Sequence, residues 1–172
     1  MSSTQVILIT GAPGIGKTTS AQLLAQNLPG ITAYCCGDVF VLAVTPLEIN
    51  DDRRLFLRRN LASFVKHAAE HKYDWVILDC VIPSDEFIFK LMEDTGLPST
   101  RFKIISLLAH REAHRERLLP KVKEGMANEA NFAACYEWTD QIRKLKMAAS
   151  IDTTNDNEHE TMARIMEIVL QN

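Results

Sequence analysis

The sequence has little of what marks several classes of protein. It has no excess of basic residues, because 19 Lys and Arg stand against 22 Asp and Glu, and the formal net charge is −3. That balance argues against a dedicated nucleic-acid binder. The opening MSSTQ contains no basic residue, and the apolar run after it is far shorter than the roughly 20 residues of a membrane-spanning helix. We therefore expect no nucleic-acid partner, no secretory leader and no membrane partner.

Cysteine is also scarce and is poorly placed for a structural role. The 172 residues include four cysteines, Cys35, Cys36, Cys80 and Cys135. The adjacent pair does not have the spacing of zinc ligands, and a chain of this length with 47% hydrophobic residues can form a core without a disulfide framework. We expect reduced thiols in a cytoplasmic protein. A redox role for the adjacent pair is the alternative.

One stretch, QVILITGAPGIGKTT at residues 5–19, organises the rest of the chain. Its unbroken apolar run at 6–9 is typical of a strand buried on both faces. Residues 11–18 fit the pattern G-x-x-x-x-G-K-[ST], and an apolar stripe with helical spacing follows as far as Pro29-Gly30. A strand, a loop and a helix in this order are the context that a phosphate-binding loop requires. The alternative is a glycine-rich turn without a ligand.

The composition of this loop indicates its chemistry. Glycine adopts backbone angles that other residues avoid, so successive N–H groups can line an anion site at the positive end of the following helix. Lys17 can reach the β- and γ-phosphates, the Thr18 hydroxyl can ligate Mg²⁺, and Thr19 is placed to contact the α-phosphate. The predicted nucleotide-binding residues of the loop are Gly11, Ala12, Pro13, Gly14, Ile15, Gly16, Lys17, Thr18 and Thr19.

Short β-like runs alternate with helical patterns along the rest of the chain. We predict strands at 6–9, 32–36, 74–79, 102–108 and 149–153, with further helices at about 50–71, 84–96, 110–118, 130–146 and 157–170. Residues 120–128 are polar and have no regular pattern. The alternation predicts an α/β fold: one domain over residues 1–172, with a five-stranded parallel sheet and helices on both faces. Ligands bind at the carboxyl ends of such strands, so we expect residues 10–11, 37–38, 79–80, 109–111 and 153–155 to meet there.

Two acids stand at the ends of predicted strands. Asp79 ends a strongly hydrophobic strand, where it would hold Mg²⁺ beside Thr18. The alternative is that it caps a neighbouring loop. Asp38 could accept a proton from an acceptor hydroxyl and contact Mg²⁺ through water, or it could be the N-cap of a helix over residues 39–44. Both roles of Asp38 are compatible.

Clusters of cationic side chains are harder to assign. One cluster lies beside the expected nucleotide edge and could stabilise a transferring phosphoryl group or form a solvated face: Arg111, Arg115 and Arg117. The other could bind an anionic acceptor or pair on the surface with Asp51 and Asp52: Arg53, Arg54, Arg58 and Arg59. His110 and His114 have the spacing of a metal pair on a helix, but the sequence offers no third ligand nearby.

Taken together, these motifs resemble the small P-loop kinases of the nucleoside monophosphate kinase-like superfamily. The resemblance covers nearly the whole chain and rests on GAPGIGKTT, CGDVF, DWVILDC, SLLAHREAHRERL and SIDTTND. Members of this group include adenylate, shikimate, gluconate and chloramphenicol kinases, and the fourth segment is also similar to the tunicamycin-resistance type of P-loop protein. The resemblance implies ATP and Mg²⁺ as cofactors.

The resemblance also implies roles for particular residues. A strand, a short helix and an Arg-Leu pair, here Arg117-Leu118, lead into a lid at about 118–129, and Lys121 stands where a second lid arginine often occurs. The end of the last strand, here Thr154 and Asn155, usually lies near the adenine. Asp38 matches the acid that several sugar and antibiotic kinases use to orient the acceptor hydroxyl. The acceptor residues of shikimate kinases and the arginine pattern with which adenylate kinases hold a second nucleotide are not evident.

The sequence therefore predicts an enzyme that transfers the γ-phosphate of Mg-ATP to a hydroxyl group of a small molecule, either a metabolite or an antibiotic. The predicted catalytic residues are Lys17, Asp38 and Arg117, and Asp38, Arg54 and Arg58 are the predicted acceptor-binding residues. A nucleoside or nucleotide kinase and a non-catalytic nucleotide-binding regulator are the alternatives. The sequence does not decide between a monomer and a homodimer.

Overall fold

A computed structural model of the chain describes residues 3–40, 51–125 and 128–171. Its strands are β1 (Gln5–Gly11), β2 (Thr32–Cys36), β3 (Trp75–Cys80), β4 (Phe102–Leu108) and β5 (Ala149–Asp152). Its α-helices are α1 (Lys17–Asn27), α2 (Asp51–Glu70), α3 (Asp85–Thr95), α4 (Arg111–Lys123), α5 (Phe132–Ile142) and α6 (Glu158–Leu170). Three short 3₁₀ helices are η1 (Gly37–Phe40), η2 (Ser99–Arg101) and η3 (Glu129–Asn131).

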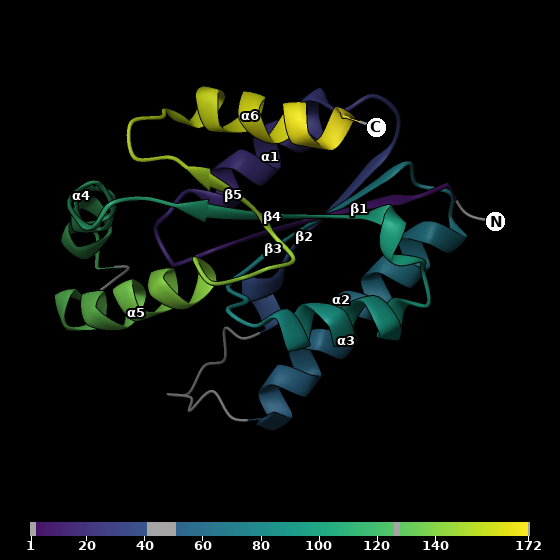
Figure 1. Ribbon diagram of the computed structural model, residues 1–172, viewed down its shortest axis with the longest axis horizontal. Helices are drawn as coiled ribbons and strands as arrows, with labels where there is room; N and C mark the ends of the chain where they lie inside the picture. The colour runs from purple at the N-terminus through teal and green to yellow at the C-terminus, as the bar shows by residue number, and fades with distance from the viewer. Residues whose placement is uncertain (1–2, 41–50, 126–127, 172) are drawn as a thin grey trace.

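The strands form one parallel sheet in the order β2-β3-β1-β4-β5. Helices α1 and α6 cover one face, helices α2, α3 and α5 cover the other, and α4 lies beyond the end of the sheet (Figure 1). This arrangement confirms the predicted three-layer α/β fold. In the described residues, no helix is both long enough and apolar enough to cross a membrane.

Each face of the sheet has its own apolar core, because side chains alternate along the strands. Val6 and Leu8 of β1 pack with α2 and α3, whereas Ile7 and Ile9 pack with α1 and α6. All four side chains are at most 1% exposed. The apolar run of β1 is thus buried on both sides, as expected for a central strand.

Helices α4 and α5 both differ in extent from the sequence prediction. Residues 120–123 belong to α4, although 120–128 had been expected to be irregular. Proline costs a helix one backbone hydrogen bond. The turn around Pro120 nevertheless stays helical because Leu118, Leu119 and Val122 pack in a third small apolar cluster. At the other end, the predicted helix 130–146 is reduced to α5 with η3 before it.

Other boundaries agree closely with the prediction. Helix α3 begins after Ser84, which accepts a hydrogen bond from the Phe87 amide, and ends at Gly96 with φ of 70°. Helix α6 begins with a capping box formed by Asn157 and Glu160. The predicted helix start at Asn50 and most of the predicted helix 39–44 lie outside the described residues.

The buried face of α2 offers a test of this packing. Leu61 is fully buried, whereas Phe56 on the same helix is 56% exposed. We expect Leu61→Ala to lower the free energy of unfolding by about 2–5 kcal/mol, because it removes buried contacts and leaves a cavity. The matched variant Phe56→Ala should change it by no more than about 0.5 kcal/mol. Urea denaturation measures both, and equal losses in the two variants would contradict this orientation of α2.

Candidate nucleotide and phosphoryl-transfer site

The carboxyl ends of the strands bring the candidate site together, as the sequence predicts. The parallel register sets Ile9 of β1 beside Asp79 of β3, and Cys36 of β2 beside Asp79 on the other side. Gly11 lies next to Leu107 of β4. Chain segments that are far apart in sequence therefore end at the same edge, where α4 covers them (Figure 1).

The loop after β1, residues 11–16, has the geometry of an anion cradle. Gly14 and Gly16 have φ angles of 80° and 107°, which other residues rarely adopt. Gly16 precedes α1, whose first intrahelical bond runs from the Ser20 amide to the Gly16 carbonyl at 3.0 Å. The amides of the first turn of a helix have no partner within the helix, so those of residues 17–19 are available to a phosphate.

Lys17 is held inside this loop. Its ammonium group donates to the Ala12 carbonyl at 3.2 Å, and the residue is only 5% exposed. Burial lowers the pKa of Lys17, while the charges of Asp38 and Asp79 oppose that shift. The lysine is therefore a positive charge within reach of both predicted acids, and its present partner is a neutral carbonyl that a phosphate can replace.

Asp79 and Thr18 form a pair that suits a divalent cation. The Thr18 hydroxyl donates to Asp79 Oδ2 at 2.6 Å, and the carboxylate is completely buried. Its other oxygen, Oδ1, has no hydrogen-bond partner among the described residues. A buried carboxylate oxygen without a donor, next to a hydroxyl group, is a fitting ligand set for Mg²⁺, which prefers oxygen ligands and keeps several of its waters. Within the described ranges, no cluster of three or more His, Cys, Asp and Glu residues forms a protein-only metal cage.

Asp38 lies in the first turn of η1, directly after β2. Burial raises the pKa of its half-buried carboxyl group. Lys17 and Lys121 act against that shift, and Asp79 adds to it. The fold therefore brings Asp38 to the P-loop lysine and to the candidate metal ligand, where the sequence had placed it. Of the helix that it was expected to cap, only residues 39 and 40 are described, and they belong to the 3₁₀ turn.

Arg117 contacts two loops of the candidate site. Its guanidinium group donates to the hydroxyl of Thr153 at 2.9 Å, to the carbonyl groups of Thr153, Thr154 and Asp156, and, at 3.4 Å, to the Ile15 carbonyl. It therefore ties the P-loop to the loop after β5, which contains the predicted adenine-binding residues Thr154 and Asn155. Both terminal nitrogens of its guanidinium group are directed at protein carbonyls and a hydroxyl, and a catalytic role for Arg117 stays a prediction.

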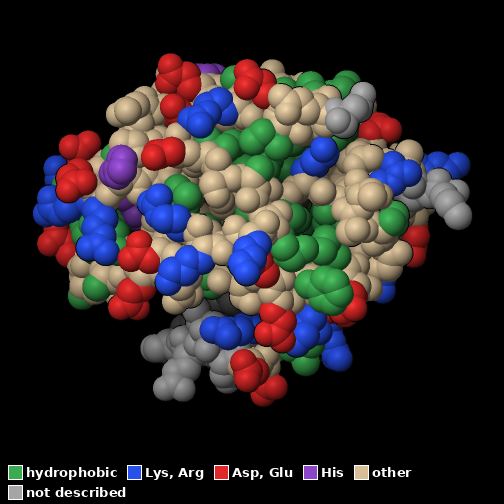
Figure 2. Space-filling view, viewed as in Figure 1, with side chains coloured by type: hydrophobic (Ala, Val, Ile, Leu, Met, Phe, Trp, Pro, Cys, Tyr) green, Lys and Arg blue, Asp and Glu red, His purple; other side chains and the backbone are tan. Residues whose placement is uncertain are grey.

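The remaining arginines are less closely tied to the site. Arg58 forms an ion pair with Asp94 of α3 at 2.8 Å, which favours a structural role over acceptor binding. Arg54 is exposed on α2, and its role in acceptor binding stays a prediction. Arg111 pairs with Asp140 at 3.3 Å and lies over the ring of Tyr136, and Arg115 is exposed. Charges of both signs gather around α4 at the left of the molecule (Figure 2).

Two residues near the site were not identified from the sequence as members of it. Tyr34 points to the same face as Asp79, and its pKa is raised by burial and by the charge of Asp79. His114 is 1% exposed, and its Nε2 contacts the Pro13 carbonyl at 2.7 Å. The spacing of His110 and His114 suggested a metal pair, but His110 lies instead near Asp152, at 3.9 Å. A single sequence does not reveal that α4 lies on the P-loop, so no pattern pointed to this contact of His114.

Comparison with solved structures identifies the fold. A gluconokinase from Sinorhizobium meliloti 1021 has a TM-score of 0.72 at 14% identity, over 98% of this chain and 93% of its own. A tunicamycin resistance protein from Deinococcus radiodurans has 0.71 at 18% identity, over 98% and 97%. The APS kinase of Mycobacterium tuberculosis, solved with AMPPNP and APS, has 0.61 at 16% identity, over 99% and 100%. The chain thus has the fold of the P-loop kinases. No protein-family model matches it, and no curated protein does.

The packing of the P-loop against α4 gives a second prediction. A Cβ atom on Gly14 would lie 2.4 Å from Leu118 Cδ2, whereas one on Gly96, which also has a positive φ, would contact nothing within 4 Å. We expect Gly14→Ala to weaken Mg-ATP binding at least tenfold, since the loop must move to make room. Gly96→Ala should cost only about 1–2 kcal/mol of stability from backbone strain. Titration calorimetry and thermal unfolding separate the two effects, and unchanged ATP binding by the Gly14 variant would contradict the described loop packing.

Proposed function

We propose that this protein is an ATP-dependent phosphotransferase that moves the γ-phosphate of Mg-ATP to a hydroxyl group of a small molecule. The observation that carries the proposal is the meeting of three groups at one edge of the sheet: the buried Lys17, the Thr18–Asp79 pair and the half-buried Asp38. Phosphoryl transfer needs a phosphate cradle, a cation site and a group that orients the acceptor, and these residues can supply each of them.

The roles of the residues follow from their positions. The amides of the loop and Lys17 hold the phosphates, with Lys17 leaving the Ala12 carbonyl for a phosphate oxygen. Thr18 and Asp79 hold Mg²⁺, which when bound neutralises charge on the β- and γ-phosphates. Asp38 accepts the proton of the acceptor hydroxyl as that oxygen bonds to the γ-phosphorus, and the bond from this phosphorus to the oxygen shared with the β-phosphate breaks to release ADP.

A cation from α4 completes the charge balance. Among Arg111, Arg115, Arg117 and Lys121, it is Lys121 whose charge acts on both Lys17 and Asp38. Its side chain is exposed on the last turns of the helix, at the start of the predicted lid. We therefore assign to Lys121 the stabilisation of the transferring phosphoryl group, and to Arg117 the positioning of the loop after β5. The acceptor is a small metabolite or an antibiotic, as the family resemblance suggests.

Loss of the P-loop lysine tests the reaction. Lys17→Ala removes the buried ammonium group of the P-loop that would bind the phosphates, so we expect turnover to fall below detection. The measurement is ADP release in the presence of a library of hydroxyl-bearing metabolites, antibiotics, nucleosides and nucleotides. The exposed Lys66 on α2 supplies the control variant Lys66→Ala, which should retain activity. Full turnover by the Lys17 variant would contradict the proposal. A slow rate of ATP hydrolysis that no acceptor changes would favour a nucleotide-binding regulator.

A substitution at Asp38 tests phosphoryl transfer separately from nucleotide binding. Asp38→Asn keeps the shape of the side chain but removes the proton acceptor, so we expect transfer to fall by about 10²-fold or more. The affinity for Mg-ATP, measured by calorimetry, should stay within a few-fold of the original value because the phosphate cradle is intact. If transfer and affinity were lost to the same extent, Asp38 would belong to the nucleotide site instead.

A further inference from the structure

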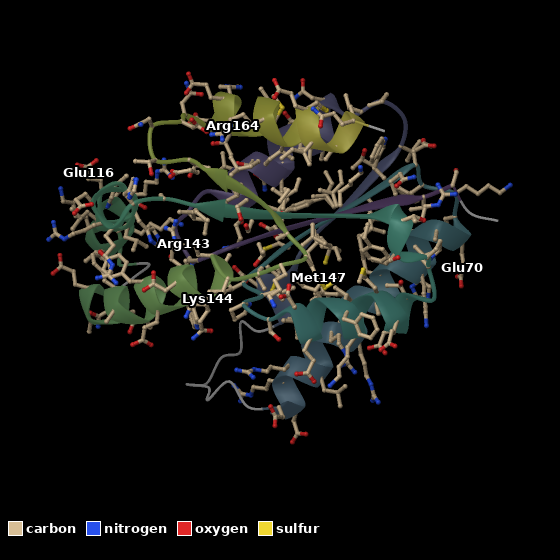
Figure 3. The ribbon with its side chains drawn as sticks, viewed as in Figure 1. Glu70, Glu116, Arg143, Lys144, Met147 and Arg164 are labelled. Carbon is tan, nitrogen blue, oxygen red and sulfur yellow. The ribbon has the colours of Figure 1, made fainter. Side chains whose placement is uncertain are left out.

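Helices α4 and α5 pack against each other through a small apolar cluster. Leu118 of α4 packs with Phe132 and Cys135 of α5, and this cluster is separate from the two cores that flank the sheet. Helix α4 lies at the carboxyl end of the strands (Figure 1), and Glu116 marks its outer side, away from the sheet (Figure 3). The opposite face of α4 carries His114 and Leu118, which rest on the P-loop.

The part of the P-loop under α4 is a β-turn. The Ile15 amide donates to the Ala12 carbonyl at 3.3 Å, which closes a turn with Pro13 and Gly14 at its centre. Gly14 has a φ of 80°, the value of the third residue of a type II turn, and proline is favoured at the second position. In the alternative type I turn, Gly14 would have a φ near −90°. The two turns differ mainly by a flip of the peptide unit between Pro13 and Gly14.

His114 holds this same peptide unit. Its Nε2 lies 2.7 Å from the Pro13 carbonyl oxygen. A carbonyl oxygen only accepts hydrogen bonds, so Nε2 must carry the proton. The ring is buried and meets Tyr136 of α5 edge-to-face, with centroids 5.8 Å apart. Its other nitrogen, Nδ1, has no hydrogen-bond partner in the parts of the chain that the structure describes. Burial lowers the pKa of His114, the hydrogen bond to the Pro13 carbonyl opposes that shift, and the charges of Arg117 and Lys17 add to it.

The orientation of this peptide unit matters for the anion cradle. The C=O of Pro13 and the N–H of Gly14 belong to one planar trans peptide and point in opposite directions. Because His114 draws the carbonyl group towards α4, the Gly14 N–H is directed away from α4. A flip to the type I turn would reverse both groups, so the N–H would face the helix and a carbonyl oxygen would take its place.

We propose that His114 is a positioning residue that keeps the Pro13–Gly14 peptide of the P-loop in its type II orientation, and so prepares the loop for the phosphates of ATP. The inference rests on the proposed function, since it assumes that the P-loop binds a nucleotide. Helix α4 thereby shapes the loop, through the buried imidazole of His114 and the Leu118 side chain that fills the space beside Gly14.

Two amide substitutions test the reach of this side chain. In His114→Gln, the amide nitrogen can occupy the place of Nε2 and donate to Pro13. In His114→Asn, it reaches only the place of Nδ1, and the hydrogen bond is lost. We expect the Asn variant to bind Mg-AMPPNP about tenfold more weakly, the equivalent of about one buried hydrogen bond, and the Gln variant to stay within about threefold. At saturating ATP, both variants should keep a turnover number close to the original, because His114 contacts no reacting group.

The control is His67→Asn, which makes the same change at an exposed histidine on α2 and should leave binding unaltered. Thermal unfolding shows whether each variant folds. Equal affinity of the folded Asn variant and the original protein would overturn the proposal, and so would equal loss in the Asn and Gln variants. If the original protein does not bind Mg-AMPPNP at all, the proposed function fails instead.

A measurement on the unaltered protein covers the case in which the Asn variant does not fold. The ¹⁵N NMR spectrum of the histidine rings distinguishes the two neutral tautomers, and it requires no nucleotide. We expect His114 to carry its proton on Nε2 throughout the pH range in which the protein is folded and the ring is neutral. A ring protonated on Nδ1 alone cannot donate to Pro13, and that result would overturn the proposal regardless of the mutants.

Discussion

A fully buried carboxylate group is the constraint on which the candidate site depends. Asp79 is completely buried at the end of β3, and burying a charge is costly unless a partner compensates it. The Thr18 hydroxyl bonds to one of its oxygens, and the charge of Lys17 lies near it. Lys17 is itself buried and gains from the same arrangement. Lys17 and Thr18 of the P-loop and Asp79 at the end of β3 are thus held together by a hydrogen bond and by opposite charges.

The strand order places the other residues of the candidate site on the two sides of the P-loop. Strand β1 lies between β3 and β4, so the P-loop has the acids of β2 and β3 on one side and the β4 and β5 loops on the other. Arg117 joins the P-loop to the β5 loop on the second side, and Asp38 faces Lys17 on the first. Under the proposed function, β1 would lie between a nucleotide side and an acceptor side.

Helix α4 connects these two sides, and its chemistry differs along its length. Its N-cap residue His110 bonds to the β5 loop, and its middle rests on the P-loop through His114 and Leu118. In its last turns, the charge of Lys121 acts on Asp38. The helix continues through Pro120 because apolar contacts with α5 compensate for the missing hydrogen bond. Residues 120–123 of the segment expected to be an irregular lid are therefore helical.

The sequence by itself determined the fold class, the P-loop and the meeting of Asp38, Asp79 and Lys17. Apolar runs, glycine spacing and acids at strand ends are local features, and parallel strands make their consequences predictable. Only the tertiary structure decided which charges are already paired, since Arg58 bonds to Asp94 and Arg117 to backbone carbonyls. It alone also revealed His114, because a contact between residues 101 positions apart leaves no periodic signal in one sequence. Patterning fixes which face of an element is buried, whereas the partner of each polar group depends on how the elements are packed.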